Sequence, residues 1–431
     1  MVAPGTKRRH AVEGQTEPDS GATDPGEATA LSPHPTSRRH RVTAALQRHQ
    51  TDVLWAVVVA VAYGICTLIV HSGSTHSVGR AMTLAIHFTQ GRLDLGTAFG
   101  SNDTVTIGGM TYWVAGPMTF IPSLPFVPFH SLWAASRWIV PASFGIAAAW
   151  FMLPLARRYG PGGSTTWWLA VLGAFGTLLF NQAIRGNDYY LTHAEALLFT
   201  VIALVEWQGH RRAWLIGLAL ALAGLARPPV LLAAIPFGLA FALYGQGRRS
   251  QVVTLAIPVV LAISLSGLYD WLRFGSPLET GYAISSLSIS ALAQNRASGV
   301  FSISHIPRNV WLLVFNGFGY QPHFPFLVAD HDGHSILLTS PALLAAVGAG
   351  IRSRTPIILW TSAALVTLVL LLYYGNGGTN TFGYRYFLDA TPFLLALTAL
   401  AARRRFGALE ELLIVMSVGF VSVWFAAIVF H

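Results

Sequence analysis

The residues best suited to chemistry stand where polar segments interrupt long apolar runs. Arg385 and Asp389 lie in residues 382–389, FGYRYFLD, at the start of an apolar run that ends in the three arginines of residues 403–405. A charged pair at the mouth of a membrane helix is costly unless it is paired or used. The two residues are one helical turn apart, so Asp389 could orient the planar fork of Arg385 toward a phosphate. This segment therefore predicts an anion-binding site.

Two further arginines stand at the ends of apolar runs. Arg227 precedes two prolines in residues 224–229, GLARPP, and Arg273 comes shortly after Tyr269, Asp270 and Trp271. Either side chain could simply extend to lipid headgroups. A lipid phosphate also needs permanently charged donors at the membrane interface, which arginine supplies. Both are therefore candidate phosphate ligands beside Arg385.

Carboxylates suited to general-base catalysis occur in two polar segments. Asp103 lies in the turn-like segment SNDT, and Asp188 opens an apolar run that also contains His193 and Glu195. Asp103 could equally be the acid of a solvated turn, and Asp188 could complement a helix dipole. An idle charge inside an apolar run is costly, however, so His193 and Glu195 favour a functional role for the second segment.

A loose group of histidines and aspartates could bind a divalent metal. Its members are His323, Asp330, His331, Asp332 and His334. Their spacing matches no defined metal site, and residues 330–334 are as typical of a solvated turn. A metal therefore stays an open possibility, with His323 a candidate for substrate support, and no other cofactor is indicated.

Composition places all these residues in a membrane protein. The 431 residues are 53% hydrophobic and only 10% charged, and the mean hydropathy is +0.53, which is typical of a polytopic chain. The formal charge of +9 could suggest a nucleic-acid partner. The arginines, however, form short clusters between apolar runs, as orientation in a membrane requires, so no nucleic acid is expected. Cys66 is the only cysteine, which excludes a disulfide within the chain.

Eleven apolar runs predict an all-α membrane protein with about eleven transmembrane helices. They are residues 53–70, 132–155, 166–182, 189–207, 213–226, 229–244, 252–269, 336–350, 356–374, 384–402 and 409–430. Arginines cluster on alternate loops, at 157–158, 211–212, 248–249, 352–354 and 403–405. The positive-inside rule assigns those loops to the cytoplasm, so the candidate site residues are expected on the external face of the plasma membrane.

The remaining segments predict a tail and an external layer. Residues 1–50 are polar and rich in Pro, Gly and Ser, so we expect a disordered cytoplasmic tail without a signal peptide, followed by one membrane domain over residues 51–431. Residues 78–90 alternate polar and apolar side chains at helical spacing, which predicts an amphipathic helix on the bilayer surface. Prolines interrupt the apolar residues 112–130, which predicts a re-entrant or interfacial segment.

Three motifs resemble a known family. They are GLARPP at residues 224–229, RFGSPLETGY at 273–282 and FGYRYFLD at 382–389. With the long first external loop, they look like bacterial integral-membrane glycosyltransferases of the GT-C superfamily. More narrowly, the chain resembles the protein O-mannosyltransferase and aminoarabinose transferase group. The resemblance runs from about residue 53 to the end of the chain.

The resemblance implies transfer of a sugar from a polyprenyl-phosphate donor to a glycan, lipid or protein acceptor at the external face. An acid in the first external loop would be the general base, and basic residues would hold the donor phosphate. The family usually places that acid just after the first span, but residues 71–77 here read HSGSTHS. The next carboxylates are Asp94 and Asp103. The motifs also nominate Glu279, Tyr282 and Tyr384 as substrate or support residues.

Two other kinds of function stay open. A transporter or lipid flippase would need polar residues near the membrane midplane and often contains an internal repeat. The sequence shows no repeat, and its polar groups lie at the ends of the apolar runs, which favours the transferase. The missing carboxylate after the first run also leaves room for a non-catalytic membrane partner built on a transferase scaffold.

Overall fold

The computed structural model describes residues 38–72, 77–97, 102–245, 247–288, 290–320, 322–323, 327–328, 330, 332–375, 377 and 381–430. The chain divides into a unit over Met1–Gln50 and a compact unit over Thr51–His431. Most of the predicted tail lies outside the described residues, and helix α1 begins within it, at Arg38. The compact unit contains the candidate site.

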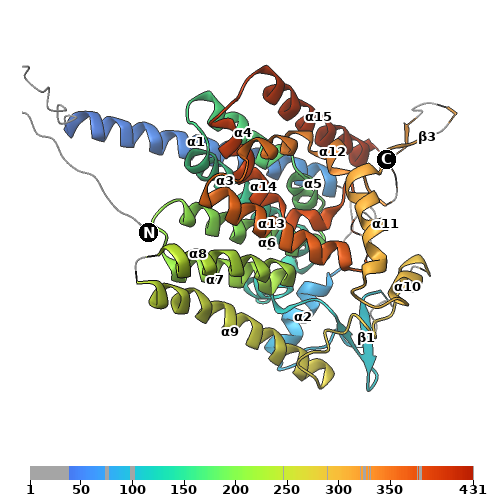
Figure 1. Cartoon of the computed structure of the whole chain (residues 1–431). Helices are drawn as coiled ribbons and strands as arrows, with labels where there is room; N and C mark the ends of the chain where they lie inside the picture. Colours follow the sequence, from blue (N-terminus) through green and yellow to red (C-terminus); the bar gives the residue numbers. More distant parts are fainter. Residues whose placement is uncertain are drawn as a thin grey trace, which may run out of the picture. The chain divides into compact units, whose positions relative to one another are not determined.

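The compact unit is built from helices (Figure 1), which confirms the all-α prediction. Six helices of the described chain are long and apolar enough to cross a membrane, and a bent pair could form a seventh span. The six are α1 (Arg38–His71), α3 (Trp133–Tyr159), α6 (Asp188–Trp207), α9 (Arg248–Phe274), α13 (Arg354–Leu372) and α15 (Ala408–Phe430). The bent pair is α4 (Ser164–Phe175) and α5 (Leu178–Arg185), which meet at 45°.

The other predicted runs form shorter or interrupted helices. They are α7 (Ala213–Ala226), η4 (Pro228–Ala233) with α8 (Ala234–Tyr244), α12 (Ile336–Thr339) with η7 (Pro341–Ala349), and η8 (Arg385–Asp389) with α14 (Thr391–Ala402). Proline occupies the first turn of η4, η7 and α14. Proline fits the first turn of a helix but cannot continue one from the preceding turn. Each predicted run is thus helical, while the count of eleven spans stays a prediction.

Small residues allow the helices to pack closely. Helix α3 packs along α6, α6 along α7, and α7 along α9, and the last pair lies side by side in Figure 1. A β-carbon at Gly217 would lie only 2.3 Å from the backbone oxygen of Leu255, so glycine is required where α7 meets α9. Small side chains at such crossings are typical of membrane helix pairs.

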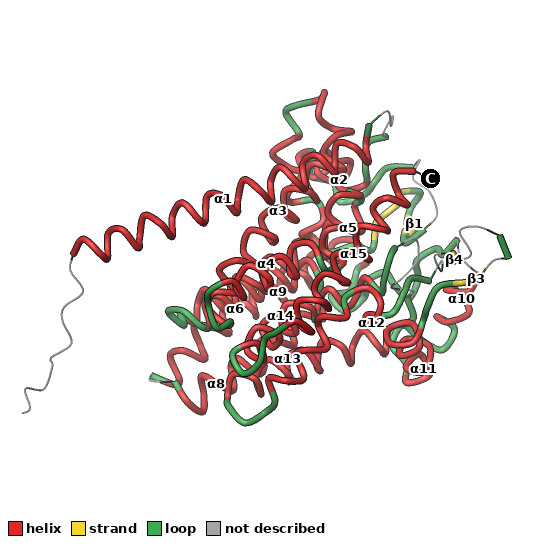
Figure 2. The backbone as a smooth tube through the Cα atoms, turned by 90° about the horizontal axis from the view of Figure 1, so that it is seen from above, coloured by secondary structure: helices red, strands yellow, loops and turns green. Residues whose placement is uncertain are grey.

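A layer of short elements covers one end of the helices (Figure 2), and we call it the external layer because the sequence predicts that its segments are external. It contains α2 (Arg80–Thr89), the hairpin of β1 (Thr104–Ile107) and β2 (Met110–Trp113), η1 (Pro117–Thr119), η2 (Ile121–Phe126) and η3 (His130–Leu132). Further along the chain follow α10 (Ser290–Arg296), η5 (Ile303–His305), α11 (Ile306–Val310), η6 (Trp311–Phe315), β3 (Gly319–Tyr320) and β4 (Leu327–Val328). The short helices η1 to η3 confirm that prolines break residues 112–130.

Helix α2 corrects one expectation. Its helical span agrees with the prediction, but its apolar residues Ala81, Leu84 and Ala85 pack against Trp113 and Phe120 of the same chain. The protein itself therefore covers these three apolar side chains of α2. Sequence periodicity identifies an amphipathic helix but not the surface that buries its apolar side.

The arginine loops gather at one end of the compact unit. Arg403 donates to the backbone oxygens of Arg158 at 2.6 Å and Gly160 at 3.1 Å. Arg404 donates to Gly348 O at 3.0 Å. These bonds join the arginine cluster of residues 403–405 to the loop that follows α3 and to the end of η7.

Candidate functional site

Three helix ends meet at the opposite end of the compact unit. Helix α6 begins at Asp188, α7 ends at Ala226, and η8 ends at Asp389 just before α14. Pro228 stops α7, because proline disfavours helical geometry in the residue before it, and this leaves Arg227 in an extended conformation. The same sequence features that end the helices thus place charged side chains beside one another.

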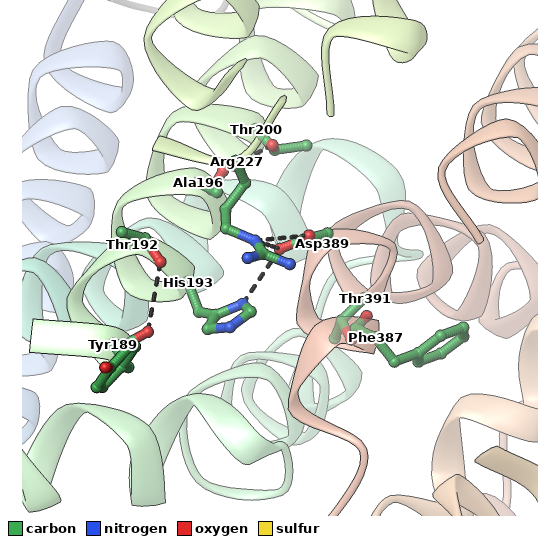
Figure 3. Close-up of polar contacts among 9 residues, drawn as sticks. All are labelled: Tyr189, Thr192, His193, Ala196, Thr200, Arg227, Phe387, Asp389 and Thr391. Atoms are coloured by element: carbon green, nitrogen blue, oxygen red, sulfur yellow. Dashed lines mark hydrogen bonds and ion pairs between the residues drawn. The ribbon is translucent and has the colours of Figure 1, made fainter. Parts of the chain in front are cut away.

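Arg227, His193 and Asp389 form a buried polar cluster (Figure 3). Arg227 Nε lies 3.0 Å from Asp389 Oδ2, and His193 Nδ1 lies 3.3 Å from Asp389 Oδ1. The Asp389 side chain is fully buried, whereas 18% of the Arg227 side chain is exposed. Asp389 therefore orients Arg227, which corrects the expectation that it would orient Arg385.

The electrostatics of Asp389 fit an ionised carboxylate. Burial alone would raise its pKa, but the charge of Arg227 and the hydrogen bonds from His193 and Arg227 outweigh burial. The pKa of Asp389 consequently lies below its ordinary value of 3.8. A buried carboxylate of this kind stays charged and fixes its cationic partner in place.

Tyr386 connects Arg227 with Arg385. The Arg227 guanidinium lies 5.0 Å from the centre of the Tyr386 ring, and the Arg385 guanidinium lies 5.3 Å from it. His193 stacks on the same ring at 5.9 Å. Cations within about 6 Å of an aromatic ring are attracted to its face. Two of the predicted phosphate ligands are therefore neighbours across one aromatic side chain.

Asp103 faces this cluster from the external layer. Its backbone is left-handed, with φ 52°, a conformation that aspartate tolerates better than most residues. Its carboxylate accepts a hydrogen bond from the Tyr189 hydroxyl. The hydroxyl of Tyr189 in turn accepts a hydrogen bond from Arg80, which also donates to Asn102 O at 2.8 Å. Asp103 is thus held between the hairpin, α2 and the start of α6.

The charges of three arginines act on the Asp103 carboxyl. Burial raises its pKa above the ordinary 3.8, and the charges of Arg385, Arg80 and Arg296 oppose this rise without cancelling it. A carboxylate with a raised pKa is a stronger proton acceptor than an exposed one. Asp188, the other predicted catalytic carboxylate, also has arginines near it, at positions 80 and 137, so its hydrogen bonds distinguish it from Asp103 and its charged neighbours do not.

Asp188 has a positioning role in the structure. Its carboxylate accepts a hydrogen bond from Arg80 N at 2.7 Å, at the first residue of α2. A β-carbon at Gly79 would lie 2.8 Å from Asp188 Oδ1, so the chain passes very close to this carboxylate. Asp188 therefore anchors the N-terminus of α2, which carries Arg80 toward Asp103.

Arg273, Glu279 and Asp94 serve the external layer itself. Arg273 donates to Asp270 Oδ1 at 2.5 Å and to backbone oxygens of residues 113 and 115, and it stacks on Tyr269. Glu279 accepts from Gly281 N at 2.7 Å, and Asp94 accepts from Gly96 N at 2.8 Å. The structure does not bring these three side chains into contact with Arg227 or Asp389 in its described part.

Tyr282 and Tyr384 lie near the cluster, and His323 does not join it. Burial raises the pKa of Tyr282, with the charges of Asp103 and Arg227 as its nearest electrostatic neighbours. Tyr384 is buried and donates to Leu370 O at 3.3 Å. His323 is exposed. In the described ranges, no three His, Cys, Asp or Glu side chains are grouped to hold a metal, and His331 lies outside those ranges.

Glu195 is buried in α6, two residues after His193. Its side chain is inaccessible to solvent, and neither carboxyl oxygen has a hydrogen-bond partner within the described chain. The structure confirms that it lies inside an apolar helix. It also separates Glu195 from the network around Asp389, since no hydrogen bond joins the two in the described residues.

Several residues around the cluster could hardly be recognised as site residues from the sequence. Arg80 was recognisable as a polar residue of an amphipathic helix, and Tyr386 lay inside a motif. Their positions in the sequence did not assign either residue a role in the site. Arg296 donates to Tyr282 O at 3.0 Å and to Ser285 O at 2.7 Å. Only the fold shows that its charge acts on Asp103.

Comparison with protein-family models, curated proteins and solved structures gives no match.

Proposed function

We propose that the protein is a membrane-embedded glycosyltransferase of the GT-C type, which moves a sugar from a polyprenyl-phosphate donor to an acceptor at the external face. The observation that carries this proposal is the partly buried Asp103 carboxyl, on which the charges of Arg385, Arg80 and Arg296 act. The end of the unit that carries it is opposite the arginine loops, which the positive-inside rule assigns to the cytoplasm.

The charge of the cluster suits a lipid phosphate. Around the cluster, arginines at positions 80, 137, 227, 296 and 385 outnumber the aspartates at 103, 188 and 389, so the formal charge is positive. A polyprenyl phosphodiester carries one negative charge. Arg227 and Arg385 are the proposed phosphate ligands, because guanidinium groups bind phosphate oxygens through paired hydrogen bonds.

The proposed mechanism uses Asp103 as general base. An acceptor hydroxyl oxygen attacks the anomeric carbon of the sugar, and the bond from that carbon to the phosphate oxygen breaks. The hydroxyl proton passes to Asp103, while the leaving lipid phosphate keeps the electron pair and is stabilised by Arg227 and Arg385. A base with a raised pKa is well matched to this proton transfer.

The test is transfer of radiolabelled sugar from a panel of polyprenyl-phosphate sugars by the purified protein in lipid nanodiscs. Asp103→Asn should reduce turnover by about 100-fold or more, because a general base contributes roughly that factor. The matched control is Asp94→Asn, whose carboxylate holds a turn of the same external layer. Wild-type turnover in Asp103→Asn would overturn the proposal.

Glu195 is the observation that favours the alternative, a transporter or flippase. Ionisable groups buried in membrane spans often mark transport pathways, and Glu195 is fully buried in α6. A transporter predicts that Glu195→Gln abolishes lipid or solute movement in proteoliposomes and that Asp103→Asn leaves it intact. A transferase predicts the opposite result: Asp103→Asn loses sugar transfer, and Glu195→Gln keeps it. Lipid-phosphate binding without any turnover would instead indicate a non-catalytic partner.

A further inference from the structure

A cavity of about 250 Å³ lies at the arginine end of the compact unit, at the opposite end of α14 from Asp389. Helices η7, α14 and α15 line it. From η7 come Ala342, Ala345 and Gly348, which recur every three residues. A helix with three residues per turn places such positions in one row along its axis. The row has almost no side-chain volume, which leaves a groove along η7.

Helix α14 supplies the facing wall. Thr398, Ala401 and Ala402 line the cavity, and their spacing of three and four residues puts them on one face of an α-helix. The Thr398 hydroxyl is buried and has no hydrogen-bond partner in the described part of the chain. A buried hydroxyl without a partner is costly. It therefore indicates a ligand or water that completes its hydrogen bonding.

Positive charge concentrates at the mouth of the cavity. Arg404 and Arg405 line it and are exposed. Glu410 also lines it, but its carboxylate accepts from Gly407 N at 2.8 Å and so serves the start of α15. Arg403 is bonded to backbone oxygens of the neighbouring loop. Two arginine side chains thus stand at the mouth of an apolar groove, and Arg404 is held there by its hydrogen bond to Gly348 O at 3.0 Å.

We propose that this cavity binds an anionic membrane phospholipid. The phosphate would lie between Arg404 and Arg405, the Thr398 hydroxyl would donate to an ester oxygen, and the first carbons of an acyl chain would follow the alanine wall. Ligand pockets for a whole drug-sized molecule measure about 300–1,000 Å³, so this cavity suits the headgroup end of a lipid. Basic pockets between membrane helices are suited to anionic lipids.

The test measures thermal unfolding of the full-length protein in detergent during titration with phosphatidylglycerol, with phosphatidylcholine and inorganic phosphate as comparison ligands. A ligand that binds the folded state raises the unfolding temperature in a saturable way. Phosphatidylglycerol should do so at the lowest concentration. An equal effect of phosphatidylcholine, or of inorganic phosphate at the same phosphate concentration, would refute the proposal.

Two variants localise the effect. Arg405→Gln should raise the half-saturating phosphatidylglycerol concentration about fivefold, since each arginine near an anionic lipid contributes about that factor. Ala345→Leu should fill the groove and abolish the saturable shift. Arg249→Gln, which removes an exposed arginine from another loop, is the matched control and should titrate as the wild type does. A wild-type titration in Arg405→Gln would refute the site even if Ala345→Leu does not fold.

Discussion

Arg227 donates from Nε to Asp389 Oδ2 at 3.0 Å, which joins two segments separated by 162 residues. Asp389 is fully buried, and Arg227 keeps a partly exposed side chain. A buried anion thus holds a cation at the edge of the external layer, where a phosphate could reach it. The pair therefore fixes the orientation of the Arg227 guanidinium.

Removal of Asp389 should destabilise the protein strongly. Breaking a buried ion pair from one side costs about 3–5 kcal/mol, because a charge stays buried without compensation. We expect Asp389→Ala to lower the free energy of unfolding by about that amount in denaturant titrations in mixed micelles. Asp332→Ala is the matched control, since its carboxylate is 3.7 Å from Arg308 and 39% exposed, and it should change stability by less than about 1 kcal/mol.

Acid should weaken the same pair. The folded-state pKa of Asp389 lies below its ordinary value of 3.8, so its contribution to stability is present above pH 3.8 and is lost as the pH falls through the folded pKa. The unfolding temperature of the wild type should therefore decline in this window, between pH 3.8 and more acidic values. Asp389→Asn should decline less steeply there, and parallel curves for the two proteins would contradict the assignment.

The variant Arg385→Lys tests whether the planar guanidinium of Arg385 binds the lipid phosphate. Arg385→Lys keeps the charge but loses the planar fork, so its affinity for a polyprenyl phosphate should fall about tenfold in nanodisc binding measurements. Arg308→Lys, in a different external segment, should leave the affinity unchanged. Unchanged affinity in Arg385→Ala would place the phosphate elsewhere.

The pH dependence of turnover should report Asp103. Burial raises the pKa of Asp103 above 3.8, and the basic form is lost as the pH falls through that raised value. The acid limb of kcat/KM should accordingly lie above pH 3.8. Asp103→Glu should retain an acid limb with reduced turnover. If the residual activity of Asp103→Asn keeps the acid limb of the wild type, that limb arises from another titrating group.

Asp188 should behave as a positioning residue. Asp188→Asn weakens the anchor of α2 and so displaces Arg80, without removal of the proposed base. Turnover should fall by less than in Asp103→Asn, and the acid limb of the pH profile should stay where it is in the wild type. A shift of that limb would give Asp188 a direct part in proton transfer.

The sequence predicted the helical segments well because apolar runs and arginine clusters are local signals. It also brought Arg227, His193, Arg385 and Asp389 into one candidate site. The sequence could not show which of these residues form an ion pair. The spacing of four residues suggested that Asp389 would pair with Arg385. The pairing with Arg227 depends on how α7 ends at Pro228 and how η8 turns before Pro392, and neither is visible in residue spacing.

The distinction between Asp103 and Asp188 also required the fold. Both are acids in polar segments, and their sequence neighbours favoured neither. In the structure Asp188 accepts from the backbone of α2, whereas Asp103 accepts from the Tyr189 hydroxyl and the charges of three arginines act on it. Contacts between residues so far apart are set by helix packing, which a single sequence does not encode in any local pattern.

The most direct measurement is a cryo-EM structure of the protein in nanodiscs with a bound polyprenyl-phosphate sugar. The account predicts phosphate oxygens within hydrogen-bond distance, about 2.7–3.2 Å, of the guanidinium groups of Arg227 and Arg385, with the anomeric carbon on the side of Asp103. A lipid phosphate bound only at Arg404 and Arg405, with the Asp103 cluster unchanged and empty, would contradict it.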